Sequence, residues 1–106
     1  MLLVVQPLLT QAAEVLQVRE ATLLQVGDRN RNYSVRLACI DVSPDNQQQA
    51  VAWLRQALPR RRRVNLRPEG TVDGLLLARV TPIGDEQDLG AALVDEGLAQ
   101  STCPSA

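Results

Sequence analysis

Residues 33–58 read YSVRLACIDVSPDNQQQAVAWLRQAL, and they place a strand, a loop and a helix in succession. Tyr33–Ile40 is rich in branched apolar residues and predicts a strand, with Arg36 alone in its apolar centre. Apolar residues then recur at helical spacing over 47–58, and Pro59 ends that predicted helix.

The flanking sequence extends this pattern in both directions. Two strand-like segments precede the stretch, and two more strands and a capped helix follow it. Polar, glycine-containing turns at 27–32 and 68–74 separate the strands. The order of three strands, a helix, two strands and a helix predicts a mainly β protein, a five-stranded OB-type barrel with two helices. The remaining elements are expected at 15–18, 22–26, 63–67, 75–80 and 89–96.

The chain has 106 residues, which suits one domain. We expect an apolar N-terminal arm at 1–13, the barrel domain at 14–100 and a flexible tail of small polar residues at 101–106. The arm is too short for a transmembrane helix, so no membrane span is expected. The compartment stays open: a cytoplasmic location is slightly favoured, and secretion follows if residues 1–13 are a truncated signal.

All the positively charged side chains of this sequence are arginines. The net charge is −1, and the eleven cations are all arginine because the chain has no lysine and no histidine. Without histidine there is no ordinary general base near neutral pH, and a bound metal is expected to be a hard cation on carboxylates. Trp53 is expected in the core, which leaves Tyr33 as the exposed aromatic; one such residue is a poor platform for stacking bases.

The two cysteines, Cys39 and Cys103, stand far apart in the sequence. Cys39 lies in an apolar run and is expected to be a buried thiol. The pair forms no metal-binding pattern and indicates no disulfide framework.

Arginines concentrate in mid-chain, and an acidic segment follows them. Such a cluster suits the phosphates of a nucleic acid or an acidic protein; the alternative is a solvated loop and strand edge. The candidate phosphate-binding residues of this run are Arg60, Arg61, Arg62 and Arg63.

Two stretches resemble motifs of the staphylococcal nuclease-like (thermonuclease) family. Residues 35–41, VRLACID, resemble its V-R-L-x-G-I-D strand, and residues 88–99, DLGAALVDEGLA, resemble its D-V-N-x-x-L-V-x-x-G-L-A helix. The resemblance covers roughly residues 14–100. It implies an OB-fold barrel of the staphylococcal nuclease type and Ca²⁺-dependent hydrolysis of DNA or RNA phosphodiesters.

Some catalytic groups of that family have counterparts here. The resemblance gives Arg36 the role of binding phosphate and Asp41 the role of holding the metal. Guanidinium and metal would stabilise the charge that builds on phosphorus. Within this protein, Arg36 has an alternative interpretation as half of an internal ion pair with Asp41 or Glu20.

Other groups are replaced. Ala21 stands where the family has a second metal-binding Asp, with Glu20 beside it as a doubtful ligand. Pro44 falls on the position of the catalytic Glu, and Asp45 would fill that role only after a one-residue insertion. The favoured interpretation of Asp45 is a helix cap, a role that either Asp45 or Asn46 can fill. Leu75 replaces a second phosphate-binding Arg.

Several functions therefore remain open. One is a catalytically impaired domain that binds nucleic acid or an acidic protein, with no cofactor. A second is a weak Ca²⁺-dependent nuclease using Arg36, Asp41 and Asp45 or Glu20. A third is a structural domain that assembles through its apolar arm. The oligomeric state is not predicted.

Overall fold

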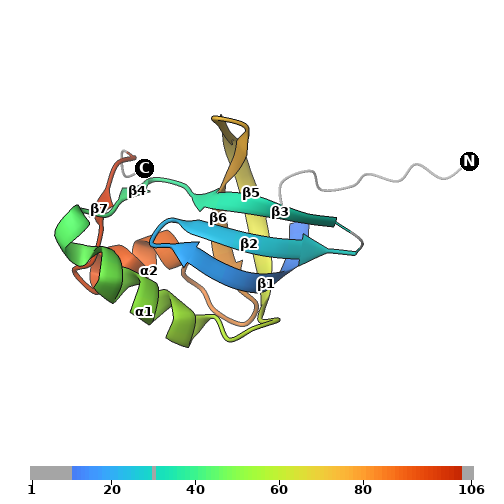
Figure 1. Ribbon diagram of the computed structural model, residues 1–106, viewed down its shortest axis with the longest axis horizontal. Helices are drawn as coiled ribbons and strands as arrows, with labels where there is room; N and C mark the ends of the chain where they lie inside the picture. The colour runs from blue at the N-terminus through green and yellow to red at the C-terminus, as the bar shows by residue number, and fades with distance from the viewer. Residues whose placement is uncertain (1–10, 30, 104–106) are drawn as a thin grey trace, which may run out of the picture.

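The computed structural model describes residues 11–29 and 31–103, whose longest strands close into one barrel (Figure 1). The strand order is β1-β2-β3-β6-β5, and pairing of β1 with β5 closes it. Strands β3 and β6 pair in parallel, and the other barrel pairs are antiparallel. The prediction of a mainly β, five-stranded OB-like barrel is confirmed. The barrel strands are β1 (Gln11–Glu20), β2 (Leu23–Asp28), β3 (Arg31–Leu37), β5 (Arg63–Val72) and β6 (Leu75–Pro82).

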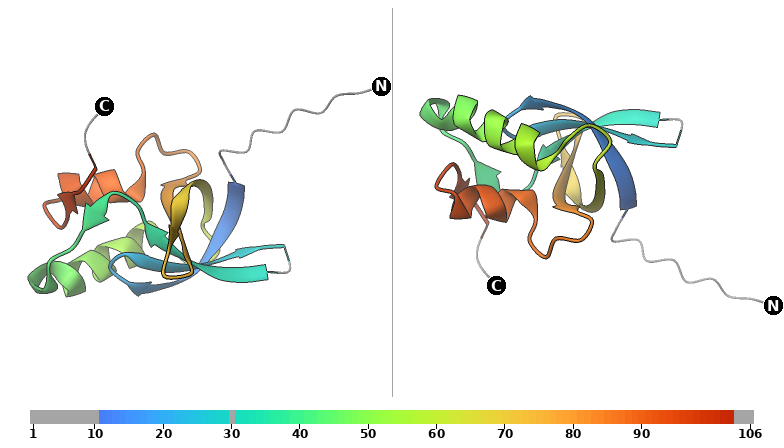
Figure 2. Two further views of the ribbon diagram at one scale, coloured as in Figure 1. Left: turned by 90° about the horizontal axis from the view of Figure 1, so that it is seen from above. Right: turned by 90° about the horizontal axis from the view of Figure 1, so that it is seen from below.

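Two helices and a small second sheet lie at one end of this barrel, opposite the tip of the β2–β3 hairpin (Figures 1 and 2). Strands β4 and β7 pair antiparallel, outside the barrel. No helix of the described residues is long and apolar enough to cross a membrane. These elements are β4 (Ile40–Asp41), the 3-10 turn η1 (Pro44–Asn46), α1 (Gln47–Ala57), α2 (Leu89–Asp95) and β7 (Gln100–Ser101).

Two strands, β1 and β5, are longer than the sequence predicts by at least five residues. Strand β1 begins at Gln11, inside the expected arm; the rest of the arm lies outside the described residues. Strand β5 continues through Pro68, where a turn was expected, because an irregularity in the ladder between Pro68 and Gly70 accommodates the missing N–H. The turn itself is confined to Asp73 and Gly74, which both have positive φ.

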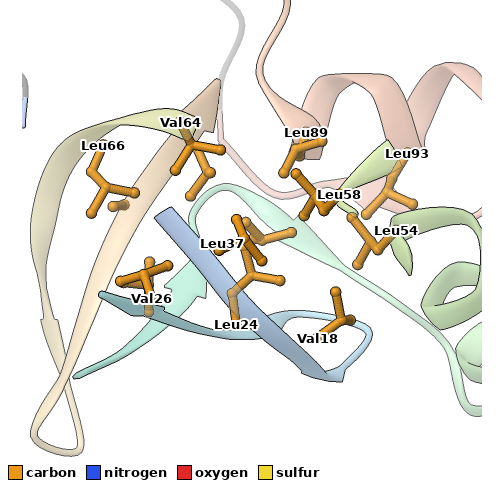
Figure 3. Close-up of a cluster of buried hydrophobic side chains, with 14 of the residues drawn as sticks. Val18, Leu24, Val26, Leu37, Leu54, Leu58, Val64, Leu66, Leu89 and Leu93 are labelled. Carbon is orange, nitrogen blue, oxygen red and sulfur yellow. The ribbon is translucent and has the colours of Figure 1, made fainter. Parts of the chain in front are cut away.

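The barrel interior is filled by aliphatic side chains from every strand and both helices (Figure 3). Alternate residues of β2 and β3 point inward, as the two-residue period of a strand requires. Trp53, expected in the core, is only partly buried and packs against it. The largest fully buried side chains include Leu24, Leu54, Leu66 and Leu93.

Helix α2 has the termini that its sequence predicts. The Asp88 carboxylate accepts a hydrogen bond from the Ala91 N–H at 3.3 Å, which is an N-cap. Gly97 follows the helix with φ 76°, and the Leu98 N–H donates to the Leu93 carbonyl at 2.9 Å, as in a Schellman motif. This cap fixes the helix against the barrel.

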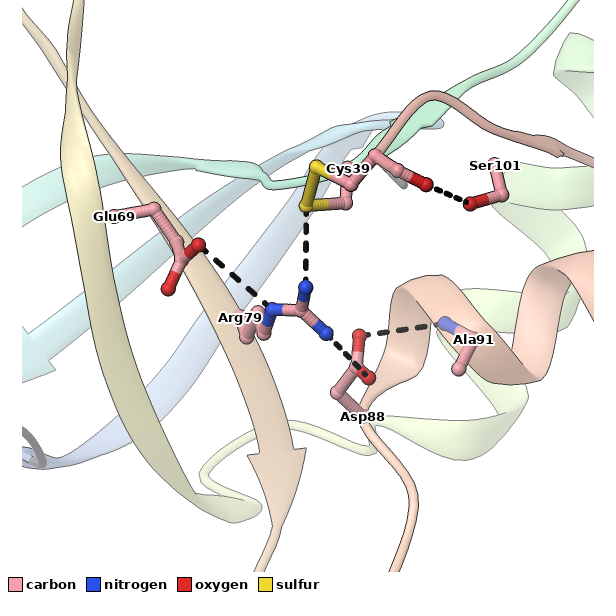
Figure 4. The surroundings of a disulfide bond; sticks show 7 residues. Cys39, Glu69, Arg79, Asp88, Ala91 and Ser101 are labelled. Carbon is pink, nitrogen blue, oxygen red and sulfur yellow. Dashed lines mark hydrogen bonds and ion pairs between the residues drawn. A yellow bond between two sulfur atoms is a disulfide. The ribbon is translucent and has the colours of Figure 1, made fainter. Parts of the chain in front are cut away.

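The two cysteines form a disulfide, so the prediction of a free buried thiol at Cys39 is wrong (Figure 4). The Cα atoms are 4.9 Å apart although 64 positions separate the residues. The sequence spacing could not show this disulfide, because Cys103 comes close to Cys39 only when β7, just before Cys103, pairs with β4. Ser101 and Cys103, expected in a flexible tail, are thereby attached to the fold.

Candidate functional site

Arg36 lies on the outer side of β3, half-buried, and its partner is a neutral hydroxyl. Its Nη1 donates to Thr22 Oγ1 at 3.0 Å. None of the ion pairs among the described residues involves Arg36, so neither Asp41 nor Glu20 is the expected ionic partner. The guanidinium is thus held by the turn that follows β1.

The carboxylates singled out by the resemblance are dispersed. Asp41 is exposed in β4, where it pairs with Gln100 across the small sheet. Asp45 is exposed in η1, and Glu20 is exposed at the end of β1. Within residues 11–29 and 31–103, no cluster of three or more acidic or cysteine side chains is placed to hold a metal ion.

The helix-capping interpretation of Asp45 has no support in the observed hydrogen bonds. Asn46 is the N-cap residue of α1, and its side chain makes no capping bond. Instead the Gln47 side chain donates from Nε2 to the Val42 carbonyl at 3.1 Å and ties the loop to the helix. Ala21, at the position of the family's second metal-binding Asp, is completely buried.

The mid-chain arginines diverge in space. Arg62 turns toward the loop after β6, where its Nη2 lies 3.2 Å from the Ile83 carbonyl oxygen and 3.8 Å from Asp85 Oδ1. Arg60 is exposed. Arg61 has φ 70° and donates its backbone N–H to the Val15 carbonyl at 2.7 Å, which anchors this loop on β1. Only Arg61 and Arg63 of the run face one groove.

That groove, hereafter the arginine groove, has a volume of about 1220 Å³. Arg29 and Arg31 of the β2–β3 hairpin line it together with Arg61 and Arg63, and all four are exposed. Two carboxylates, Glu14 and Asp28, also line the groove. The other described lining residues are the small or apolar Ala12, Ala13, Leu16 and Gly27 and the polar Asn32.

Strand register explains why four of these residues share a surface. Arg63 of β5 pairs with Glu14 of β1, Glu14 pairs with Gly27 of β2, and Gly27 pairs with Asn32 of β3. Directly paired residues point to the same face of a sheet, so the four form one row across four strands. Gly27 contributes no side chain to this row, and the Leu16 side chain of β1 lies against it.

The sequence did not identify Arg29 and Arg31, which lie in a segment predicted as a polar turn. Arg29 lies in the turn with φ 58°. Arg31 pairs with Asp28 directly beside that turn. The available signal was the alternation that continues from Tyr33 back to Arg31 along the same strand.

Tyr33 is half-buried and packs against the core, so it is not the exposed stacking residue that was expected. Its hydroxyl is buried and has no hydrogen-bond partner among the described residues. Desolvation by burial, and secondarily the charge of Asp28, raise the pKa of the phenol above its ordinary value, while Arg31 opposes this.

A second arginine-centred cluster lies beside the disulfide (Figure 4). Arg79 of β6 donates from Nη2 to Cys39 Sγ at 3.3 Å. The same guanidinium lies 3.9 Å from Glu69 Oε1 and 3.9 Å from Asp88 Oδ1. Both of its charged partners are carboxylates of the chain itself, so Arg79 serves to fasten α2 and the tail to the barrel.

Comparison with known proteins gives no family: no protein-family model matches the chain, and no curated protein matches its sequence.

Proposed function

We propose that this chain is a staphylococcal nuclease-like domain that has lost hydrolysis and acts as a binding module for an anionic polymer, nucleic acid above all. The single observation that carries this proposal is the contrast in surroundings of its arginines. Arg36 is engaged by Thr22, whereas Arg61 and Arg63 project into an open groove.

The backbone at Cys39 supports the family resemblance. Cys39 stands at the glycine position of the V-R-L-x-G-I-D motif and has φ 68°, a left-handed conformation that favours glycine. The OB-like barrel agrees with the same resemblance.

The state of the inherited site supports the loss of hydrolysis. A Ca²⁺ site needs several oxygen ligands, whereas Asp41 is exposed on a separate small sheet and Ala21 is buried where another carboxylate would be needed. Losing one group that stabilises transition-state charge costs about 10²–10³ in rate, and several are replaced here.

The test is cleavage of labelled single-stranded DNA and RNA with Ca²⁺ and with EDTA, alongside Asp41→Ala and Arg36→Ala. We expect folded protein to bind an oligonucleotide without cutting it. Metal-dependent cleavage that both substitutions abolish would replace this proposal with the weak Ca²⁺-dependent nuclease.

A further inference from the structure

We infer that the arginine groove, which β1, the β2–β3 hairpin and the start of β5 line, binds the phosphodiester backbone of a nucleic acid strand through Arg29 and Arg31 of the hairpin and through Arg61 and Arg63 beside β5. The inference rests on the proposed binding function and gives it a site. That site is separate from Arg36 and from every carboxylate implicated in catalysis.

Charge and accessibility are the first argument. Four guanidinium groups line the groove against two carboxylates, in a protein whose net charge is −1. Among the described residues, none of the four side chains lies within 4.0 Å of a carboxylate, in contrast to Arg62 and Arg79. Their donors are therefore free to meet an external anion, and the planar guanidinium suits two phosphate oxygens at once.

Shape is the second argument. The row from Arg63 through Glu14 and Gly27 to Asn32 crosses three strand intervals, a span of about 14 Å at the usual strand separation. A linear polyanion can lie along such a trough and contact the arginines of the hairpin and those beside β5.

The lining favours nucleic acid over an acidic protein. Protein interfaces depend on aromatic and other large anchors in their centre. Among the described residues that line the groove none is aromatic, and the apolar ones are two alanines and Leu16. Contacts with phosphates need no such anchor, and they give binding that tolerates any base sequence.

The experiment is titration of labelled oligo-dT, oligo-U and a DNA duplex, followed by fluorescence anisotropy at several salt concentrations. Four phosphate contacts predict a slope of log affinity against log salt of about −3 for single strands. Arg29→Ala/Arg31→Ala and Arg61→Ala/Arg63→Ala should each weaken binding about tenfold and reduce the size of the single-strand slope by about 1.4. The three probes show whether single strands or duplexes are preferred.

The matched control is Arg60→Ala/Arg67→Ala, which removes the same charge from exposed positions outside the groove. This control variant should retain most of the oligonucleotide affinity and most of the salt dependence.

Equal losses of affinity in all three double variants would overturn the groove as the site while leaving the binding function intact. Absence of oligonucleotide binding by folded protein, with groove-dependent capture of poly-glutamate, would overturn the inference in favour of an acidic protein. The proposed function itself fails on different results, namely metal-dependent cleavage, or no binding of either oligonucleotide or poly-glutamate by folded protein.

Discussion

Strand β3 carries an arginine near each end, and the two side chains have different surroundings. At the end near the helices, Arg36 is half-buried and donates to Thr22. At the hairpin end, Arg31 is exposed and lines the arginine groove. The family resemblance points to the first, whereas the open surface is at the second. The comparison teaches that the neighbours of a cation, more than its place in a motif, decide whether it can bind a ligand.

The two ends also differ in how they are held. The helix end has the disulfide, the Asp88 cap and the Arg79 cluster, whereas the contacts described toward the hairpin end are the strand ladder and hydrogen bonds of the 61–63 backbone, such as that of Arg61 with Val15. We therefore expect changes at the helix end to alter stability and changes at the hairpin end to alter binding.

The largest effect is expected from the disulfide. In the double variant Cys39→Ser/Cys103→Ser, the free energy of unfolding should fall by about 2–4 kcal/mol, because the bond closes a long loop in the unfolded chain. Chemical denaturation measures this loss, and reducing agent should lower the stability of the parent protein similarly. Oligonucleotide affinity of the folded variant should stay within twofold. A large loss of affinity would show that the ends are not independent.

Two glycines allow the next comparison. A Cβ at Gly90 would lie 3.1 Å from Ile40 Cγ2 and 3.3 Å from the Ala38 carbonyl oxygen, so Gly90→Ala should cost about 1–3 kcal/mol. A Cβ at Gly27 would meet only the movable Leu16 side chain at 3.2 Å, and Gly27→Ala should cost less while weakening oligonucleotide binding. Thermal unfolding of both variants provides the measurement; the reverse order of stabilities would contradict this account of the two ends.

The two arginines of β3 are expected to have opposite effects: one substitution lowers stability and the other lowers oligonucleotide affinity. Arg36→Ala should destabilise by about 1 kcal/mol, since it removes a hydrogen bond from a partly buried hydroxyl, and should leave oligonucleotide affinity unchanged. Arg31→Ala should change stability by less than about 0.5 kcal/mol, because its side chain is exposed, and should weaken binding. If both substitutions weakened oligonucleotide binding equally, Arg36 would have to be part of the binding site.

The smallest effect is expected at Tyr33. Its folded-state pKa is raised, so the folded protein holds the phenolic proton longer than the unfolded chain does. The contribution of Tyr33 to stability is fully present below the unfolded pKa of about 10 and is lost as pH rises from there through the folded value. Denaturation curves around this range should therefore show a decline that Tyr33→Phe removes.

Tyr33→Phe should be neutral or stabilise by up to about 1 kcal/mol at neutral pH, because the buried hydroxyl has no hydrogen-bond partner among the described residues. A clear loss of stability at neutral pH would mean that this hydroxyl has a partner in solution.

Local signals in the sequence predicted most of the fold. The two-residue alternation located the five barrel strands, and Asp88 and Gly97 located the ends of α2. Two of the errors share a cause: they arose where long-range pairing overrides a local pattern. Pro68 and Gly70 resemble turn residues, yet pairing with β6 keeps them in a strand. Cys103 resembles a residue in a loose tail, yet pairing of β7 with β4 brings it to Cys39.

The candidate site was predictable only in part. The sequence showed that the cations are arginines and that many stand together at 60–63, because composition and clustering need no coordinates. It did not show that Arg62 turns away, or that Arg29 and Arg31 come from another hairpin to join Arg61 and Arg63. Barrel closure brings β5 beside β1, and only that closure places the two pairs around one groove.

The sequence by itself thus determined the elements and the chemistry of the side chains, since strand alternation, helix caps and residue types are local properties. The tertiary structure alone decided which arginines have a partner within the protein and which are exposed to solvent. Arg36 faces Thr22, Arg79 faces Glu69 and Asp88, and the groove arginines face solvent. Such partners lie far apart in the chain, and their distances are fixed only when the register of the closed barrel is set.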